Sequence, residues 1–272
     1  MIKALKRLSK ISLSHYIKLI FRSALFISAA VIYIINRINK TGMPFGDSEH
    51  KSLVLGVIWL VFVIEMIFRF FPSKIESMGC QKQFARNFKN TNASKEKPKL
   101  QSAKSTFAVA AFWIGLNAII GLLYYIHIID EGILFLISLA FSVCDMICIL
   151  FFCPFQTWFM KNKCCTSCRI YNWDYAMMFT PLVFIKSFYT WSILLCAVML
   201  LVRWEITVFK YPERFSEETN ACLSCTGCQE RLCSHKKQLR GFLLRNKSRL
   251  QLKGNEILGK VNNIQKKLRK NG

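Results

Sequence analysis

The hydrophobic residues of the chain fall into five long runs, separated by shorter polar and basic segments. Runs of about 18 or more apolar residues with few charges are typical of transmembrane helices. The five runs are Leu19–Asn36, Leu53–Phe71, Phe107–Ile129, Gly132–Cys153 and Tyr175–Val202. A chain of 272 residues could not bury roughly 110 residues of this kind inside a soluble core. We therefore predict an all-α, polytopic membrane protein.

The segments around these runs complete the predicted organisation. Residues Ala29 and Ala30 in the first run are followed by more apolar residues and not by a polar boundary, so we expect this run to be retained and not cleaved as a signal peptide. The predicted regions are a basic N-terminal segment (1–18), the first two runs (19–71), a basic polar loop (72–106), a hairpin of the third and fourth runs (107–153), a loop rich in Cys and aromatic residues (154–174), the fifth run (175–202), and a Cys-rich basic tail with amphipathic helices (203–272).

The charge of the chain predicts its orientation in the membrane. The sequence has 38 Lys and Arg against 15 Asp and Glu, a net charge of +23, while 53% of it is hydrophobic. This combination is not typical of a soluble enzyme or a soluble nucleic-acid-binding protein. With the N-terminus in the cytoplasm, segments 1–22, 72–106 and 154–175 place +6, +6 and +2 inside, and only +1 (37–52) and −2 (Asp130-Glu131) lie outside. Positive charge is enriched in cytoplasmic loops, so the first four runs agree on this orientation.

The fifth run leaves two topologies open. A single crossing would place the tail 203–272, with its charge of +10, outside. However, Pro181 and Lys186 interrupt the run, and a proline inside a helix kinks or breaks it. A broken run could be re-entrant or could cross twice, provided that protein shields it from lipid. We expect a cytoplasmic tail, because modules rich in thiols stay reduced in the cytoplasm.

Seven of the twelve cysteines lie in two short clusters, and these predict a metal site. The tail cluster has the spacing C-x2-C-x2-C-x4-C and consists of Cys222, Cys225, Cys228 and Cys233. Over about twelve residues it resembles the cluster-binding run of bacterial ferredoxins, although the last spacer is one residue longer and Ser234 replaces the proline. The resemblance implies that these four thiolates hold an iron–sulfur cluster.

The second cluster gives zinc as the rival metal. It lies in the loop after the fourth run and consists of Cys164, Cys165 and Cys168. Cys165-x-x-Cys168 together with Cys225-x-x-Cys228 would supply the four thiolates of a tetrahedral zinc site. Such a shared site requires the loop and the tail to lie on the same side of the membrane. Disulfides, if the tail is outside, and plain reduced thiols remain the alternatives without a metal.

Four charged residues inside the apolar runs are expected to pair. Glu65 and Arg69 are spaced i, i+4 on one helix and are predicted to pair with each other. Asp145 in the fourth run and Lys186 in the fifth lie at similar predicted depths. Ionisable groups within the bilayer pair and often mark transport paths, so we predict an intramembrane pair of Asp145 and Lys186, beside Cys144 and Cys148.

These features support three hypotheses for function. The first is membrane-associated electron transfer or redox and metal sensing by the Cys-ligated metal module, and not a stand-alone enzyme. The second is a membrane anchor or assembly scaffold that binds a protein partner, or anionic headgroups, through the basic tail. The third is a small transporter. Nothing beyond charge favours nucleic-acid binding, and bis-His haem is not expected because His127 alone lies near a run.

Overall fold

The computed structural model describes residues 10–39, 49–72, 78–91, 98, 100, 102–162, 164 and 167–224, with the side chains of 10–12 and 49–54 excluded. The chain divides into two units, 1–230 and 231–272, and every described residue belongs to the first. The predicted amphipathic helices of the tail therefore lie outside the described residues.

Within the described residues the protein is all-helical, as predicted, and contains no β-strand. Its long helices are α2 (Lys10–Ile38), α3 (Glu49–Phe70), α5 (Ala103–Tyr125), α6 (Glu131–Leu150) and α8 (Phe188–Lys210). Its short helical elements are α4 (Met78–Gln81), η1 (Ala85–Asn87), η2 (Phe155–Phe159), η3 (Arg169–Trp173), α7 (Asp174–Phe179), η4 (Thr180–Phe184), η5 (Pro212–Arg214) and η6 (Ala221–Leu223).

Four of the long helices are long and apolar enough to cross a membrane. They are α2, within its residues Leu13–Ile38, and the whole of α5, α6 and α8. Helix α3 occupies the second predicted run. Many large apolar side chains on these helices face outward, among them Ile20, Phe107 and Phe209, which is the pattern of helices surrounded by lipid.

Local sequence explains where these helices begin and end. The carboxylate of Asp130 caps α6, because its Oδ1 accepts a hydrogen bond of 2.9 Å from the backbone N–H of Ile133. Pro72 follows α3, and Pro154 follows the end of α6. Proline lacks the amide donor that would continue a helix, so both helices end before it.

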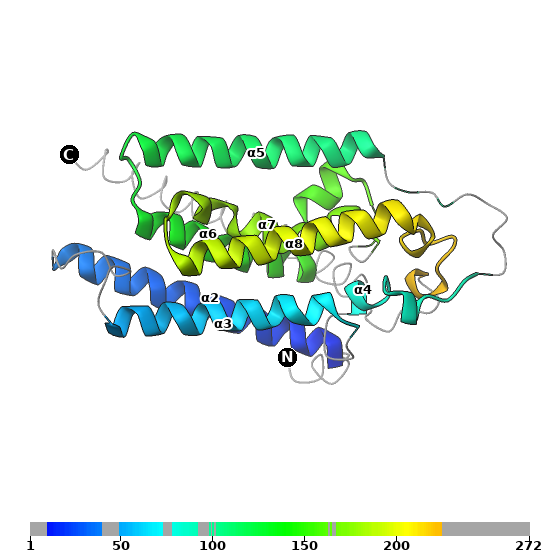
Figure 1. Ribbon diagram of the computed structural model, residues 1–272, viewed down its shortest axis with the longest axis horizontal. Coiled ribbons are helices and arrows are strands. Elements are labelled where there is room, and N and C mark those ends of the chain that lie inside the picture. The colour runs from blue at the N-terminus through cyan, green and yellow to red at the C-terminus, as the bar shows by residue number, and fades with distance from the viewer. Residues whose placement is uncertain are drawn as a thin grey trace, which may run out of the picture. The chain divides into compact units, whose positions relative to one another are not determined.

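The long helices pack in pairs, and α7 lies between two of them. Helix α2 packs on α6, α3 packs on α8, and α7 contacts both α6 and α8, while α5 contacts η4 and η2 (Figure 1). At Gly121 of α5 the ring of Phe184 lies so close that a Cβ atom would clash with it. The glycine therefore permits the close approach of α5 and η4.

The fifth predicted run is broken, and its two parts run in opposite directions. Just before the first part begins, Arg169 and Trp173 of η3 both bond to Glu205, near the end of α8. At its finish, Phe184 contacts Tyr124, near the end of α5. The chain then turns at 185–187, and α8 returns toward the first end. The chain therefore does not form a single helix over Tyr175–Val202, and whether its first part crosses the membrane stays a prediction.

Other parts of the protein bury the first of these two parts. Tyr175, Met178, Phe179 and Leu182 are each at most 3% exposed, and Pro181 is among the fully buried side chains.

Candidate functional site

A buried arginine joins three helices at the centre of the bundle. The Arg22 side chain of α2 is 2% exposed. Its Nη2 lies 2.8 Å from Oε2 of Glu65 on α3, and its Nη1 lies 3.0 Å from Oδ2 of Asp145 on α6. Nη1 also donates to the backbone carbonyl of Ser142, at 3.1 Å. A single guanidinium therefore pairs with two carboxylates at once, using the fork geometry that suits arginine better than lysine.

Further donors surround Glu65. The hydroxyl of Tyr175 donates to its Oε2 at 3.0 Å, and Nζ of Lys18 lies 3.5 Å from its Oε1. Tyr175 comes from α7, so the network around Arg22 connects the buried first part of the fifth run to α2, α3 and α6. Polar networks in a low-dielectric interior specify one arrangement of the elements that contribute to them when each member has partners.

A second buried ion pair lies on the same helix α3. Arg69 is 3% exposed and binds both carboxylate oxygens of Asp174, the first residue of α7, at 2.8 and 2.7 Å. The guanidinium also lies over the ring of Tyr175, 4.6 Å from its centroid. This bidentate pair fixes the position at which α7 enters the bundle.

The charged residues predicted to pair are therefore paired with other partners. The cation that contacts Asp145 is Arg22, and Lys186 is exposed in the turn before α8. Glu65 and Arg69 bond to Arg22 and Asp174, on other elements, and not to each other as an i, i+4 pair. The Glu65–Arg69 pairing is wrong because packing between helices gives each side chain a partner on another element. The Asp145–Lys186 pairing is wrong because Arg22 of α2 reaches Asp145, while Lys186 lies exposed in the turn before α8.

A cavity lined by thiols lies beside this network. Its volume is about 290 Å³. The polar lining comprises Cys144, Asp145, Cys148, Cys153, Gln156, Cys168 and Asp174. The remaining wall is apolar and aromatic, and includes Trp113, Phe141 and Phe155. The sequence had placed Asp145 beside Cys144 and Cys148, and the structure adds Cys153 and Cys168 from the following loop.

Three segments that are far apart in the sequence meet at one end of the helical unit, and we call this meeting the junction. The segments are 78–91 after α3, 155–173 after α6, and 212–224 after α8 (Figure 1). The amide of Asn220, which is fully buried, donates to the carbonyls of Lys82 and Arg214 at 3.0 and 2.8 Å. The backbone N–H of Ala221 donates to the carbonyl of Lys89 at 2.8 Å. The base of the tail is thus fixed to the loop after α3.

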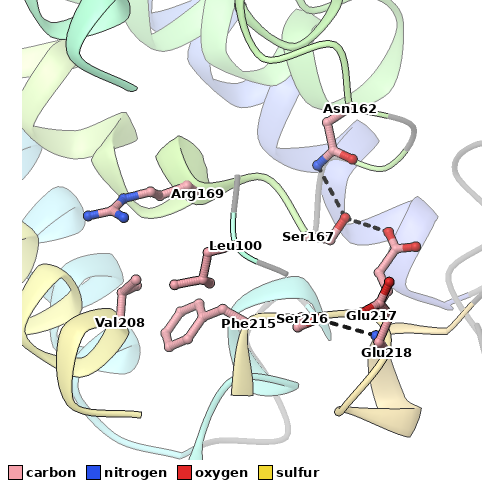
Figure 2. A pocket seen from close by; sticks show the side chains of 9 residues that line it. All are labelled: Leu100, Asn162, Ser167, Arg169, Val208, Phe215, Ser216, Glu217 and Glu218. Atoms are coloured by element: carbon pink, nitrogen blue, oxygen red, sulfur yellow. Dashed lines mark hydrogen bonds between the residues drawn. The ribbon is translucent and has the colours of Figure 1, made fainter. Parts of the chain in front are cut away.

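The loop that carries the second cysteine cluster joins the same junction through a pocket of about 220 Å³. Figure 2 shows a chain of hydrogen bonds on its polar side: Asn162 to Ser167 at 3.2 Å, and Ser167 to Glu217 at 2.7 Å. Leu100, Val208 and Phe215 line its apolar side (Figure 2). Glu217 lies five residues before Cys222 in the sequence, so this bond joins the loop to the base of the tail.

The predicted metal ligands are described only in part. Cys165, Cys225, Cys228 and Cys233 lie outside the described residues. Cys168 is buried in an apolar cluster with Val109, Met160 and Ile170, and the thiol of Cys222 contacts the carbonyl of Asn87 at 3.2 Å. Cys164 lies in the loop, where its carbonyl accepts a bond from Asn162. No group of three His, Cys, Asp or Glu residues could hold a metal ion within the part of the chain that is described.

Sequence reasoning missed the central role of Arg22 and of Asp174. Arg22 lies at the start of the first run, where an arginine is expected to extend toward the headgroups. Asp174 lies in the loop before the fifth run and reads as a helix cap. Charge balance could not have signalled either role, because Arg22 and Arg69 already match Glu65 and Asp145 in number without Asp174.

The fold thus defines a helical protein with four helices able to cross a membrane and a buried ionic core. Comparison of the chain with protein-family models, curated proteins and solved structures finds no match. The function must therefore be argued from the site itself.

Proposed function

We propose that this protein is a multi-pass membrane protein that carries a cysteine-ligated metal module on the cytoplasmic face, and that it serves in membrane-associated redox chemistry or metal sensing. The observation that carries the proposal is the bond between Ser167 and Glu217, which joins the loop with Cys164, Cys165 and Cys168 to the base of the Cys-rich tail. A metal site shared by loop and tail requires this contact between the two segments, and a tail on the opposite side would forbid it.

The direction of the helices supports a cytoplasmic junction. Tyr16 of α2 contacts Phe151 beyond the end of α6, whereas Tyr33 bonds to Asp130 at the opposite end. The start of α2 therefore lies at the same end as the junction. The described parts of the net-positive segments 1–22, 72–106, 154–175 and 203–272 adjoin the bundle at that end. Under the positive-inside rule this end would face the cytoplasm.

The metal would be held by thiolates whose spacing suits zinc or an iron–sulfur cluster. The expected ligands of an iron–sulfur cluster are Cys222, Cys225, Cys228 and Cys233. The shared zinc site would instead take Cys165 and Cys168 from the loop with Cys225 and Cys228 from the tail. Cys168 supports the shared site least, because it packs among apolar side chains. An iron–sulfur cluster would make the module an electron-transfer or redox-sensing centre, and zinc would make it a structural element of a scaffold.

The first test is metal analysis of the full chain, purified without oxygen. We expect about one metal centre per chain, with visible absorbance if the centre is iron–sulfur. Changing Cys225 and Cys228 together to Ser removes two thiolates and is expected to abolish metal retention, because structural sites need their complete ligand set. The matched control is Cys196→Ser, which changes a thiol on α8 outside both cysteine clusters.

A colourless wild-type protein without zinc would refute the metal module. That result would leave the anchor hypothesis, in which the basic tail itself binds a protein partner or anionic lipid.

Topology provides an independent prediction. A reporter fused after Gly272 is expected to be cytoplasmic, because α7–η4 and α8 run in opposite directions and return the chain to the junction. The same reporter inserted at 127–129, in the turn between α5 and α6, is expected to be external. A C-terminal fusion that reports an external position would overturn both the orientation and the shared metal site.

A further inference from the structure

The strongest feature that the proposed function does not use is a pair of thiols in the cavity beside Asp145. Cys148 lies on the last turn of α6, and Cys153 lies three residues beyond the end of that helix. Both thiols line the same cavity, and they interact electrostatically with each other. Both are present as thiols in the structure, and both are half-buried.

The end of α6 is what brings these residues together. On a continuous α-helix, residues five apart are displaced by about 7.5 Å along the axis and face different directions. Here α6 ends at Leu150, and the backbone N–H of Phe152 bonds back to the carbonyl of Ile147 at 3.1 Å. This bond turns the chain, so that Cys148 and Cys153 both line the same cavity. Two thiols that face one cavity from either side of a helix end can reach disulfide geometry with little backbone movement.

The apolar lining of the cavity favours an apolar oxidant for the thiol pair. Trp113, Phe141 and Phe155 give its wall three aromatic rings, and Leu116 and Ile149 add aliphatic surface. Cys144, whose side chain is exposed on α6, is part of the lining, so the cavity reaches the outer surface of the helices. With α6 in a bilayer, an apolar ligand would enter from the lipid phase, and a flat, apolar ring of modest size fits a cavity of about 290 Å³.

We propose that this cavity binds a lipid-soluble quinone, and that Cys148 and Cys153 reduce it. In the reaction the two S–H bonds break and one S–S bond forms between Cys148 Sγ and Cys153 Sγ. The two electrons and two protons released convert the two carbonyl groups of the quinone into the hydroxyl groups of the quinol. The backbone N–H of Gln156 donates to Cys153 Sγ at 3.4 Å, so it stabilises negative charge on that sulfur as its proton leaves.

This proposal does not depend on the metal module, because the cavity lies within the helical unit and its thiol pair is separate from the tail cluster. A reductant of the dithiol or disulfide class would have to regenerate the thiols for more than one turnover. A single oxidation of Cys148 and Cys153 needs no such reductant, and the experiment measures this one step.

The test uses the full chain in lipid nanodiscs, reduced and then kept without oxygen. Decylubiquinone is the probe, since its fully substituted ring resists addition of thiols. We expect one equivalent of quinol per chain and a peptide containing a Cys148–Cys153 disulfide on mass spectrometry. In Cys148→Ser and in Cys153→Ser, quinol formation is expected to fall to the rate without protein, whereas Cys196→Ser is expected to match the unchanged protein.

Two results would overturn the proposal. One is full alkylation of Cys148 and Cys153 after incubation of the unchanged protein with decylubiquinone, a measurement that does not rely on any variant folding. The other is formation of the disulfide with oxidised glutathione, a water-soluble oxidant, but not with the quinone, which would show a thiol pair that serves soluble partners.

Discussion

Arg22→Met is expected to cause the largest loss of stability of any single change in the described part of the chain. Asp145 would lose its guanidinium partner, and Glu65 would keep only Tyr175 and the longer contact to Lys18. Removing one partner of a buried ion pair costs about 3–5 kcal/mol, because the remaining charge is left without compensation. We expect a lower midpoint of unfolding in a denaturing detergent, and a smaller fraction of monodisperse protein after heating.

The double variant Arg22→Met with Asp145→Asn separates this explanation from simple loss of packing. If the uncompensated carboxylate is the cause, neutralising it should recover most of the lost stability. If the double variant is as unstable as Arg22→Met, the ionic network is not what stabilises this region. Lys186→Met is the matched control, since it removes an exposed cation from the turn before α8, and it should change stability by less than about 0.5 kcal/mol.

Arg69→Ala is expected to have the second largest effect, of about 3 kcal/mol or more. The change leaves the carboxylate of Asp174 buried, with its side chain only 8% exposed, and it removes the cation from the face of Tyr175. Because Asp174 begins α7, we expect the loss to appear first as increased proteolysis within 169–187. Unfolding in detergent gives the global cost, and limited proteolysis with mass spectrometry locates it.

A double-mutant cycle measures the pair directly. If Arg69 and Asp174 interact as the structure indicates, the effects of Arg69→Ala and Asp174→Ala will not add, and the coupling will be at least about 1.5 kcal/mol. Arg37→Ala provides a contrast, because its contact with Asp130 is 3.4 Å long and its side chain is 74% exposed. Exposed pairs of this kind contribute about 0–1 kcal/mol. Additive effects at Arg69 and Asp174 would contradict the assigned role.

The sequence predicted the long helices well, since hydropathy is a local property of each segment. Four of the five runs correspond to one helix each, with ends displaced by a few residues except at α2, which begins at Lys10 and not at Leu19. The fifth run shows the limit of this reasoning. Pro181 indicated a break. The direction of the chain after the break, however, depends on how α7 packs between α6 and α8, which the sequence of the run does not contain.

The partners of the buried charges could not be predicted in the same way. Spacing along one helix suggested Glu65 with Arg69, and similar depth suggested Asp145 with Lys186. Which helix faces which is decided by packing, and the pairing of α2 with α6 brings Arg22 to Asp145. The cavity was anticipated around Cys144, Asp145 and Cys148, whereas Cys153 and Cys168 join it only through the turn after α6. The predicted metal ligands of the tail remain predictions.

The buried segment formed by α7 and η4 has a consequence for the insertion of the protein into the membrane. A segment of this length, containing Pro181 and beginning with an acid, is a poor substrate for insertion into a bilayer by itself. The α7–η4 segment can be buried only after α6 and α8, the two helices that it packs against, have both been synthesised. We therefore expect this segment and α8 to enter the membrane together, as one unit.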